Sequence, residues 1–194
     1  PRIGLGYSII GQIGLLKVCG ILKLDGGELF QCFRTLEQTK AGVVSRAKEL
    51  VKRVLGDLVV VVAAQHLSGN AHVLANQINE NAKTASFYFL LPELDHHLLE
   101  GLGRPNEKNL IFAFLASNFY SEKIQKRLKL TKEVVEKNNI EVCEFKPSGE
   151  NKLCQVLETL WFGSFLSFYL AIGSGIDPTP IPWVDYFKEK LASS

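Results

Sequence analysis

Hydrophobic positions change character near residue 56. Residues 3–24 are apolar almost throughout, whereas residues 39–55 interleave apolar positions with lysines and arginines. In this second run the apolar positions recur at three- and four-residue steps: Val43, Ala47, Leu50, Val51 and Val54. The pattern predicts a buried apolar helix followed by an amphipathic one. The first run approaches the roughly 20 apolar residues of a membrane span, but Lys17 interrupts it and no basic cluster flanks it. We therefore favour a helical arm over residues 1–55 and no membrane partner.

Beyond residue 56, strand-like and helix-like segments alternate. Residues 58–64 form a continuous β-branched run, which is typical of a strand buried on both faces. The further strand-like runs are 85–91, 110–117 and 140–145, and the helix-length segments between and after them are 70–81, 120–137 and 151–172. This alternation predicts an α/β domain over residues 56–194, with a doubly wound parallel sheet and helices on both sides. In such sheets ligands bind beyond the carboxyl ends of the strands, where we expect the site.

Toward the C-terminus, residues 160–172 combine aromatic side chains with serines. The stretch is short for a membrane span and typical of a core helix. Residues 177–182 contain three prolines, each of which fixes its φ angle, so a stiff connector is expected. A short helix over residues 183–191 should follow, and it carries Lys188 and Lys190.

Composition narrows the class of protein. Of the 194 residues, 46% are hydrophobic and 22% are charged, as in an ordinary folded domain. The 22 basic and 20 acidic residues leave a net charge of +2, so no strong field indicates a nucleic-acid partner. The chain has no methionine and opens with Pro1, so we expect it to be a piece of a longer protein.

The cysteines indicate a cellular compartment. They show no CxxC spacing and lie in apolar or mixed sequence: Cys19, Cys32, Cys143 and Cys154. We expect buried free thiols in a reducing cytoplasm rather than disulfides or metal ligands. No basic segment with a following cleavage site opens the chain, so we do not expect a secretory signal. We expect a cytoplasmic location instead.

One carboxylate stands out as a candidate base. Glu80 lies between Asn79 and Asn81 in the run Gln77-Ile-Asn-Glu-Asn-Ala-Lys83, at the end of the first helix of the sheet domain. Amides can orient a carboxylate without neutralising it, which suits a general base near neutral pH. The alternative is a polar helix terminus whose side chains make capping contacts.

A histidine pair follows the second predicted strand. His96 and His97 could exchange protons near neutral pH, and a metal site would need one of the only other histidines, His66 and His72. No zinc-binding spacing is present, so no metal is expected. Glycine-rich phosphate loops are also missing. After the first strand, Ser68 or Asn70 could cap the next helix and present free N–H groups to an anion.

Four motifs occur in an order that resembles a known family. They are Pro1-Arg-Ile-Gly-Leu-Gly-Tyr7, Gln77–Lys83, Pro92-Glu-Leu-Asp-His-His-Leu-Leu-Glu-Gly101 and Gly175-Ile-Asp-Pro-Thr-Pro-Ile-Pro182. The chain is similar to the C-terminal half of the bifunctional phosphoglucose/phosphomannose isomerases of the sugar isomerase (SIS) superfamily. The resemblance implies a flavodoxin-like second SIS domain with its connecting helices, a hexose 6-phosphate substrate, no cofactor, and a homodimer. It also implies an upstream SIS domain that holds the phosphate.

The resemblance implies a role for each site residue. Glu80 would move a proton between C1 and C2 through a cis-enediol, and His96 would assist ring opening in the site of the neighbouring subunit. Lys188 is preferred over Lys190 as the lysine near the substrate ring. Thr179 is expected to approach the sugar, with Asn79 and Ser68 as further binding candidates.

Two departures from the family pattern stand beside this resemblance. Asp95 replaces the usual asparagine and adds a negative charge that favours an imidazolium at His96. Residues 73–75 are Val-Leu-Ala where many members have Arg-Trp-Lys, so the resemblance implies the loss of a contact there. A regulatory SIS module that binds a sugar phosphate without turnover is the alternative to an enzyme, and a purely structural dimerisation domain is a third interpretation.

Overall fold

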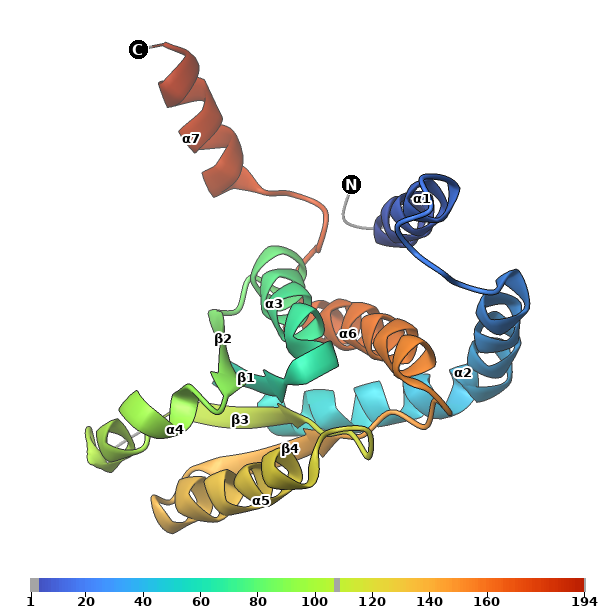
Figure 1. Cartoon of the computed structure of the whole chain (residues 1–194). Coiled ribbons are helices and arrows are strands. Elements are labelled where there is room, and N and C mark those ends of the chain that lie inside the picture. The colour runs from blue at the N-terminus through green and yellow to red at the C-terminus, as the bar shows by residue number, and fades with distance from the viewer. Residues whose placement is uncertain (1–3, 107–108, 194) are drawn as a thin grey trace.

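A computed structural model describes residues 4–106 and 109–193, so the first three residues of the motif at 1–7 lie outside the described residues. A parallel sheet forms the centre of the protein (Figure 1). Its strands are β1 (Leu58–Ala64), β2 (Ser86–Leu91), β3 (Leu110–Leu115) and β4 (Glu141–Phe145), and they lie in the order β2-β1-β3-β4. In its register Val61 of β1 lies opposite Tyr88 of β2 and Ala113 of β3. The predicted α/β fold with a parallel sheet is therefore confirmed.

Helices cover both faces of this sheet. The β1–β2 and β3–β4 connections run in opposite directions across it, so right-handed crossovers place their helices on opposite faces. These helices are α3 (Ser68–Gln77) and α5 (Glu122–Lys137), and α6 (Lys152–Gly173) packs beside α3 (Figure 1). Short elements complete the connections: 3-10 turns over Gln65–Leu67 and Glu100–Gly103, a π-helical turn over Ile78–Ala82, and α4 over Leu94–His97.

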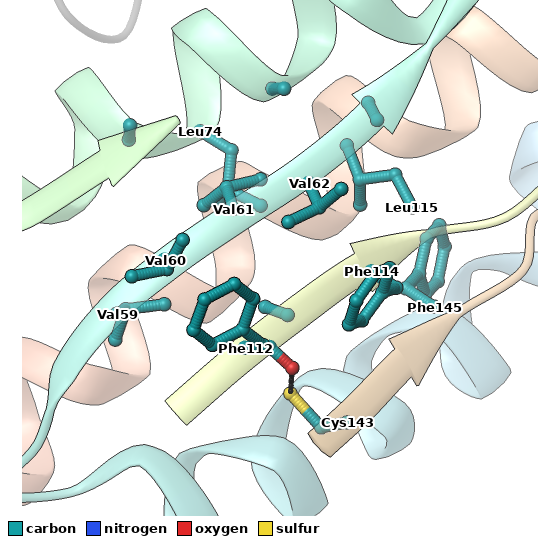
Figure 2. Close-up of a cluster of buried hydrophobic side chains, with 14 of the residues drawn as sticks. Val59, Val60, Val61, Val62, Leu74, Phe112, Phe114, Leu115, Cys143 and Phe145 are labelled. Atoms are coloured by element: carbon teal, nitrogen blue, oxygen red, sulfur yellow. Dashed lines mark hydrogen bonds between the residues drawn. The ribbon is translucent and has the colours of Figure 1, made fainter. Parts of the chain in front are cut away.

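The core sits where the β-branched strand meets the phenylalanines of β3. Residues 59–64 of β1 are all buried, and Figure 2 shows four valines of this strand beside Phe112 and Phe114 of β3. On β4, the Cys143 thiol donates to the Phe112 carbonyl at 3.6 Å. Burial raises the pKa of Cys143 to about 12, which keeps this thiol protonated.

Helix α2 (Gly26–Val54) packs into the same core. Its apolar positions 43, 47, 50, 51 and 54 are buried, as the spacing predicts. At the edge of the sheet, Arg53 Nε donates to Glu141 Oε1 at 2.7 Å and Arg46 donates to the Lys146 carbonyl at 2.6 Å. A domain boundary at residue 55 stays a prediction, although the second half of α2 shares its core with the sheet.

The two ends of the chain form the least covered helices. The sequence predicts a buried helix over residues 3–24, and this is wrong: α1 (Leu5–Val18) is helical, but none of its residues is buried. The reason is its position outside the layers that cover the sheet (Figure 1). The short C-terminal helix is present as α7 (Pro182–Ala192), and none of its residues is buried either.

Helix α6 behaves as a core helix. By length and composition alone it is the one helix, within the described part of the chain, that could cross a membrane. Half of its apolar 18-residue window is nevertheless buried inside the protein, including Phe162, Leu166 and Leu170. The core-helix prediction for residues 160–172 is therefore confirmed.

The expectation of four free thiols is wrong. Cys32 of α2 and Cys154 of α6 form a disulfide, with their Cα atoms 5.0 Å apart, whereas Cys19 is free and exposed and Cys143 is free and buried. The two bonded residues are 122 positions apart in sequence. Only the packing of α2 against α6 brings them together, so spacing along the chain could not reveal the pair.

Candidate active site

Glu80 lies in a turn with unusual backbone geometry. The five residues Ile78–Ala82 continue α3 as a π-helical turn, which ends at Lys83 with a left-handed φ of 53°. Such π turns are rare and occur frequently at functional sites. Glu80 is exposed in this turn. We call residues 78–83 the Glu80 turn.

The amides beside Glu80 fasten the backbone of this turn. Asn79 Nδ2 donates to the carbonyls of Ala75 at 2.9 Å and Ser86 at 2.8 Å, while its Oδ1 accepts from Ser86 N at 3.0 Å. Asn81 Nδ2 donates to Ser167 Oγ of α6 at 3.0 Å. The amides therefore orient Glu80 through the chain that carries it. Asn79 has a structural task in this turn, and the substrate contact expected for it stays a prediction.

Thr179 comes close to the same turn. Lys83 Nζ donates to the Glu80 carbonyl and, at 3.2 Å, to the carbonyl of Pro178. The next residue, Thr179, donates its N–H to Asp177 Oδ1 at 2.8 Å. The structure thus brings Glu80, Asn79 and Thr179 to one region, although they are up to 100 residues apart in sequence.

A groove of about 1050 Å³ adjoins this region. Its walls come from α1, α2 and α6, and it reaches the Glu80 turn and the C-terminal connector through four polar residues: Gln77, Asn81, Ser164 and Thr179. Gln77 Nε2 donates to Ser164 Oγ at 2.9 Å, which joins the end of α3 to α6. The remaining lining is mostly apolar, with Phe33, Trp161 and Phe165 among its larger side chains.

The Glu80 turn lies at the opposite end of the sheet from the one expected. Helix α3 runs back from the carboxyl end of β1 to the amino end of β2, and Asn79 binds the first residue of that strand. The expectation of a site beyond the carboxyl ends of the strands is thus not met for Glu80. The physical reason is the direction of α3, which carries the chain away from the carboxyl end of β1 before the Glu80 turn begins. The carboxyl end of the sheet is occupied instead by side chains of α6.

Glu158 of α6 binds the backbone N–H groups that follow β4. Its carboxylate is 2% exposed and accepts from the N–H groups of Ser148 at 2.8 Å and Gly149 at 2.9 Å, and from the Ser148 hydroxyl at 3.1 Å. Adjacent backbone N–H groups of this kind form a concavity that binds anions. Here the protein's own carboxylate is the anion.

Gln155 closes the ends of β1 and β3 in the same way. Its Oε1 accepts from Ser117 Oγ at 2.5 Å and lies 3.3 Å from His66 Nε2, and its Nε2 donates to Asn118 Oδ1 at 2.7 Å. Burial lowers the pKa of His66, so the neutral imidazole is favoured in this network. Asn70 donates to the Val156 carbonyl at 2.9 Å, and Ser68 also lies here, away from Glu80.

His96 also lies at the carboxyl end of the sheet. It belongs to α4, which follows β2, and is exposed. Asp95 does not stand free beside it, because its carboxylate accepts from Arg127 at 2.9 Å and from Thr131 at 2.7 Å. Glu80 precedes β2 and His96 follows it, so the two residues lie at opposite ends of this strand. The six residues of β2 span about 17 Å. Lys188 is exposed on α7.

The histidines do not converge. His72 stacks on Tyr88 with ring centroids 4.7 Å apart, and His97 lies 6.0 Å from the ring of Phe89. Across residues 4–106 and 109–193, no group of three or more histidine, cysteine or acidic side chains is arranged to hold a metal ion.

Solved structures of other proteins share this fold. A glucose-6-phosphate isomerase like protein from Thermus thermophilus matches 71% of this chain and 46% of its own, with a TM-score of 0.58 at 23% identity. The C-terminal domain of glucosamine-fructose-6-phosphate aminotransferase from Francisella tularensis matches 78% of this chain and 45% of its own, with a TM-score of 0.61 at 18% identity. At these identities the likeness defines the fold alone.

Sequence comparison gives the family. Residues 43–191 match the model for the bacterial phospho-glucose isomerase C-terminal SIS domain, and the chain belongs to this family. It is 26% identical over 192 residues to a bifunctional phosphoglucose/phosphomannose isomerase of Aquifex aeolicus, covering 98% of this chain and 58% of that protein. A protein of the same description from Pyrobaculum aerophilum is 31% identical over 131 residues, covering 68% of this chain and 39% of its own. The chain thus spans about 60% of the length of the first relatives that it matches.

Proposed function

We propose that this chain is the base-carrying half of an enzyme that isomerises glucose 6-phosphate or mannose 6-phosphate to fructose 6-phosphate. Family membership supports the reaction class, and the observation that carries the assignment is the fastened turn that presents Glu80 beside Thr179. A carboxylate held by its backbone on several sides is suited to a reaction in which position decides the rate. The proposed location stays the cytoplasm, although the bond between Cys32 and Cys154 removes the support that four free thiols would have given.

The proposed chemistry is proton transfer between adjacent carbons. The Glu80 carboxylate takes the C2 proton of the open-chain aldose, and the C–H electron pair forms the C1–C2 double bond while charge moves to O1. A proton passes from O2 to O1, the proton on Glu80 goes to C1, and the carbonyl is left at C2. A general base raises the rate of such a step by roughly 10²–10⁴-fold. Thr179 and Lys188 are assigned to the sugar and its ring.

Closure of the carboxyl end of the sheet supports a phosphate site outside this chain. Glu158 already occupies the N–H groups that follow β4, and Gln155 fills the ends of β1 and β3. A substrate phosphate would have to displace a buried carboxylate of the same charge. We therefore assign the phosphate to the upstream SIS domain, whose binding energy would hold the sugar against Glu80.

The separation of Glu80 from His96 supports a site shared between two copies of the protein. The length of β2, about 17 Å, keeps both side chains of one chain from reaching neighbouring atoms of a single sugar. In a two-fold symmetric dimer, His96 of one copy can instead serve the Glu80 site of the other. Ring opening by this imidazole would then supply the open-chain sugar to the base.

A regulatory module that binds the sugar phosphate without turnover is the second candidate function. The exposed position of Lys188 and the uncovered helix α7 are compatible with either candidate. Glu80 distinguishes them, because a sensor needs no base.

Complementation between two inactive variants tests the proposal. In this chain joined to its upstream domain, Glu80→Gln and His96→Asn should each abolish the conversion of fructose 6-phosphate. Subunits of both variants, mixed after dissociation, should regain up to about a quarter of the normal activity, because half the dimers then hold one intact site. Mixing without recovery would contradict a shared site. No conversion by the unaltered joined protein, with the sugar phosphate still bound, would instead support the sensor.

A further inference from the structure

Lys83 connects two segments of the candidate site that are far apart in sequence. Its ammonium donates to the carbonyl of Glu80 within the turn and to the carbonyl of Pro178, 95 positions away, at 3.2 Å. The first contact closes the turn on itself. The second joins the turn to the connector that follows α6 and carries Thr179.

The backbone at Lys83 makes this double contact possible. Lys83 has a φ of 53°, in the left-handed region that residues other than glycine adopt uncommonly. This conformation ends the π-helical turn and reverses the chain before β2. The long side chain is thereby brought back to a carbonyl three residues earlier.

Asn79 and Asn81 also fasten the Glu80 turn, and they point in different directions. Asn79 holds it to α3 and to the start of β2, whereas Asn81 holds it to Ser167 of α6. All three of these partners belong to the packed layers of the sheet domain. The Lys83 contact differs, because its partner belongs to the connector rather than to a helix or strand of the core.

We infer that Lys83 is a positioning residue that sets the Glu80 base against Thr179 and the C-terminal connector, and this inference rests on the proposed function. Lys83 acts through the two carbonyl groups that it binds and need not touch the substrate. The sugar would lie between the base on one segment and the hydroxyl on the other. Without the ammonium, the two segments lose their common partner and the base shifts relative to the reacting carbon.

Steady-state kinetics test the inference in this chain joined to its upstream domain. The variants compared are Lys83→Met, Lys83→Arg and Lys126→Met. Methionine keeps the length of the side chain without donors, arginine keeps the charge and donors, and Lys126 is an exposed lysine of α5. A misplacement of about 1 Å can cost roughly 100-fold, so kcat should fall about 10- to 100-fold in Lys83→Met while KM changes less. Lys83→Arg should recover part of this loss, and Lys126→Met should leave kcat unchanged.

An isotope effect separates positioning from a merely structural role. With glucose 6-phosphate deuterated at C2, Lys83→Met should show a larger primary isotope effect on kcat than the unaltered protein, because proton abstraction becomes more fully rate-limiting. A kcat within about twofold of normal, or a lower kcat with an unchanged isotope effect and a lower melting temperature, would overturn the inference. Glu80→Gln is measured alongside. If Glu80→Gln is inactive while Lys83→Met is unaffected, this inference alone is overturned. If Glu80→Gln is active, the proposed function is overturned.

Discussion

Replacing Glu158 with glutamine tests whether the carboxyl end of the sheet is closed by the protein itself. The substitution keeps the shape of the side chain and one acceptor oxygen but removes the negative charge. In the unaltered protein Glu158 Oε2 accepts both backbone N–H groups of the turn after β4, at 2.8 and 2.9 Å, in a position that is 2% exposed. A hydrogen bond to a charged group is worth about 1.5–3 kcal/mol net, against about 0.5–1.5 for a neutral one.

The loss of charge on these two bonds predicts a destabilisation of about 2–3 kcal/mol. For a chain of 194 residues this corresponds to a fall in melting temperature of roughly 5–7 °C. Urea unfolding followed by circular dichroism measures the free energy, and Glu49→Gln on the exposed side of α2 is the matched control, expected to be indistinguishable from the unaltered protein. A cost below about 1 kcal/mol for Glu158→Gln would contradict a closing role for the Glu158 carboxylate.

Three further predictions concern packing, thiols and pH. A Cβ at Gly149 would lie 2.7 Å from backbone atoms of α6, so Gly149→Ala should destabilise the protein by about 1–3 kcal/mol in the same urea assay. The control Gly42→Ala has open space around its Cβ and should be neutral or stabilising. Thiol titration of the unfolded, unreduced protein should count two thiols, rising to four after reduction of the bond between Cys32 and Cys154; four before reduction would contradict the disulfide. Because burial lowers the pKa of His66 below 6.5 in the folded state, its contribution to stability is complete above that pH and is lost as the pH falls below it. His66→Gln should therefore flatten the dependence of the unfolding free energy on pH between about 7 and 5, and an unchanged slope would contradict this.

Local patterns were sufficient to predict the sheet. The β-branched run of β1 and the alternation of strand and helix lengths carry the parallel α/β fold, because a strand buried on both faces must be apolar throughout. The three-and-four spacing on α2 likewise predicts its buried face. Periodicity could not predict the exposure of α1, since an apolar helix has the same sequence whether or not other elements cover it.

The site was predictable only in part. Glu80 stands out because a carboxylate lies among amides, and family resemblance supplies His96, Lys188 and Thr179. The closed carboxyl end of the sheet was missed, since Gln155 and Glu158 look like ordinary polar positions of a helix until α6 packs over the strand ends. Lys83 was missed as a link for a similar reason: its partner Pro178 is distant in sequence, and only its place beside the Glu80 motif gave a signal.

The most direct test of Glu80 as the base of an isomerase is a coupled assay of fructose 6-phosphate conversion by this chain joined to its upstream domain, compared with its Glu80→Gln variant. We expect the joined protein to be active and the variant to lose roughly 100-fold or more, the scale of a lost general base. A Glu80→Gln variant within a few-fold of the unaltered enzyme would contradict the role of Glu80. Inactivity of both proteins, with the sugar phosphate still bound, would contradict the isomerase and favour the sensor.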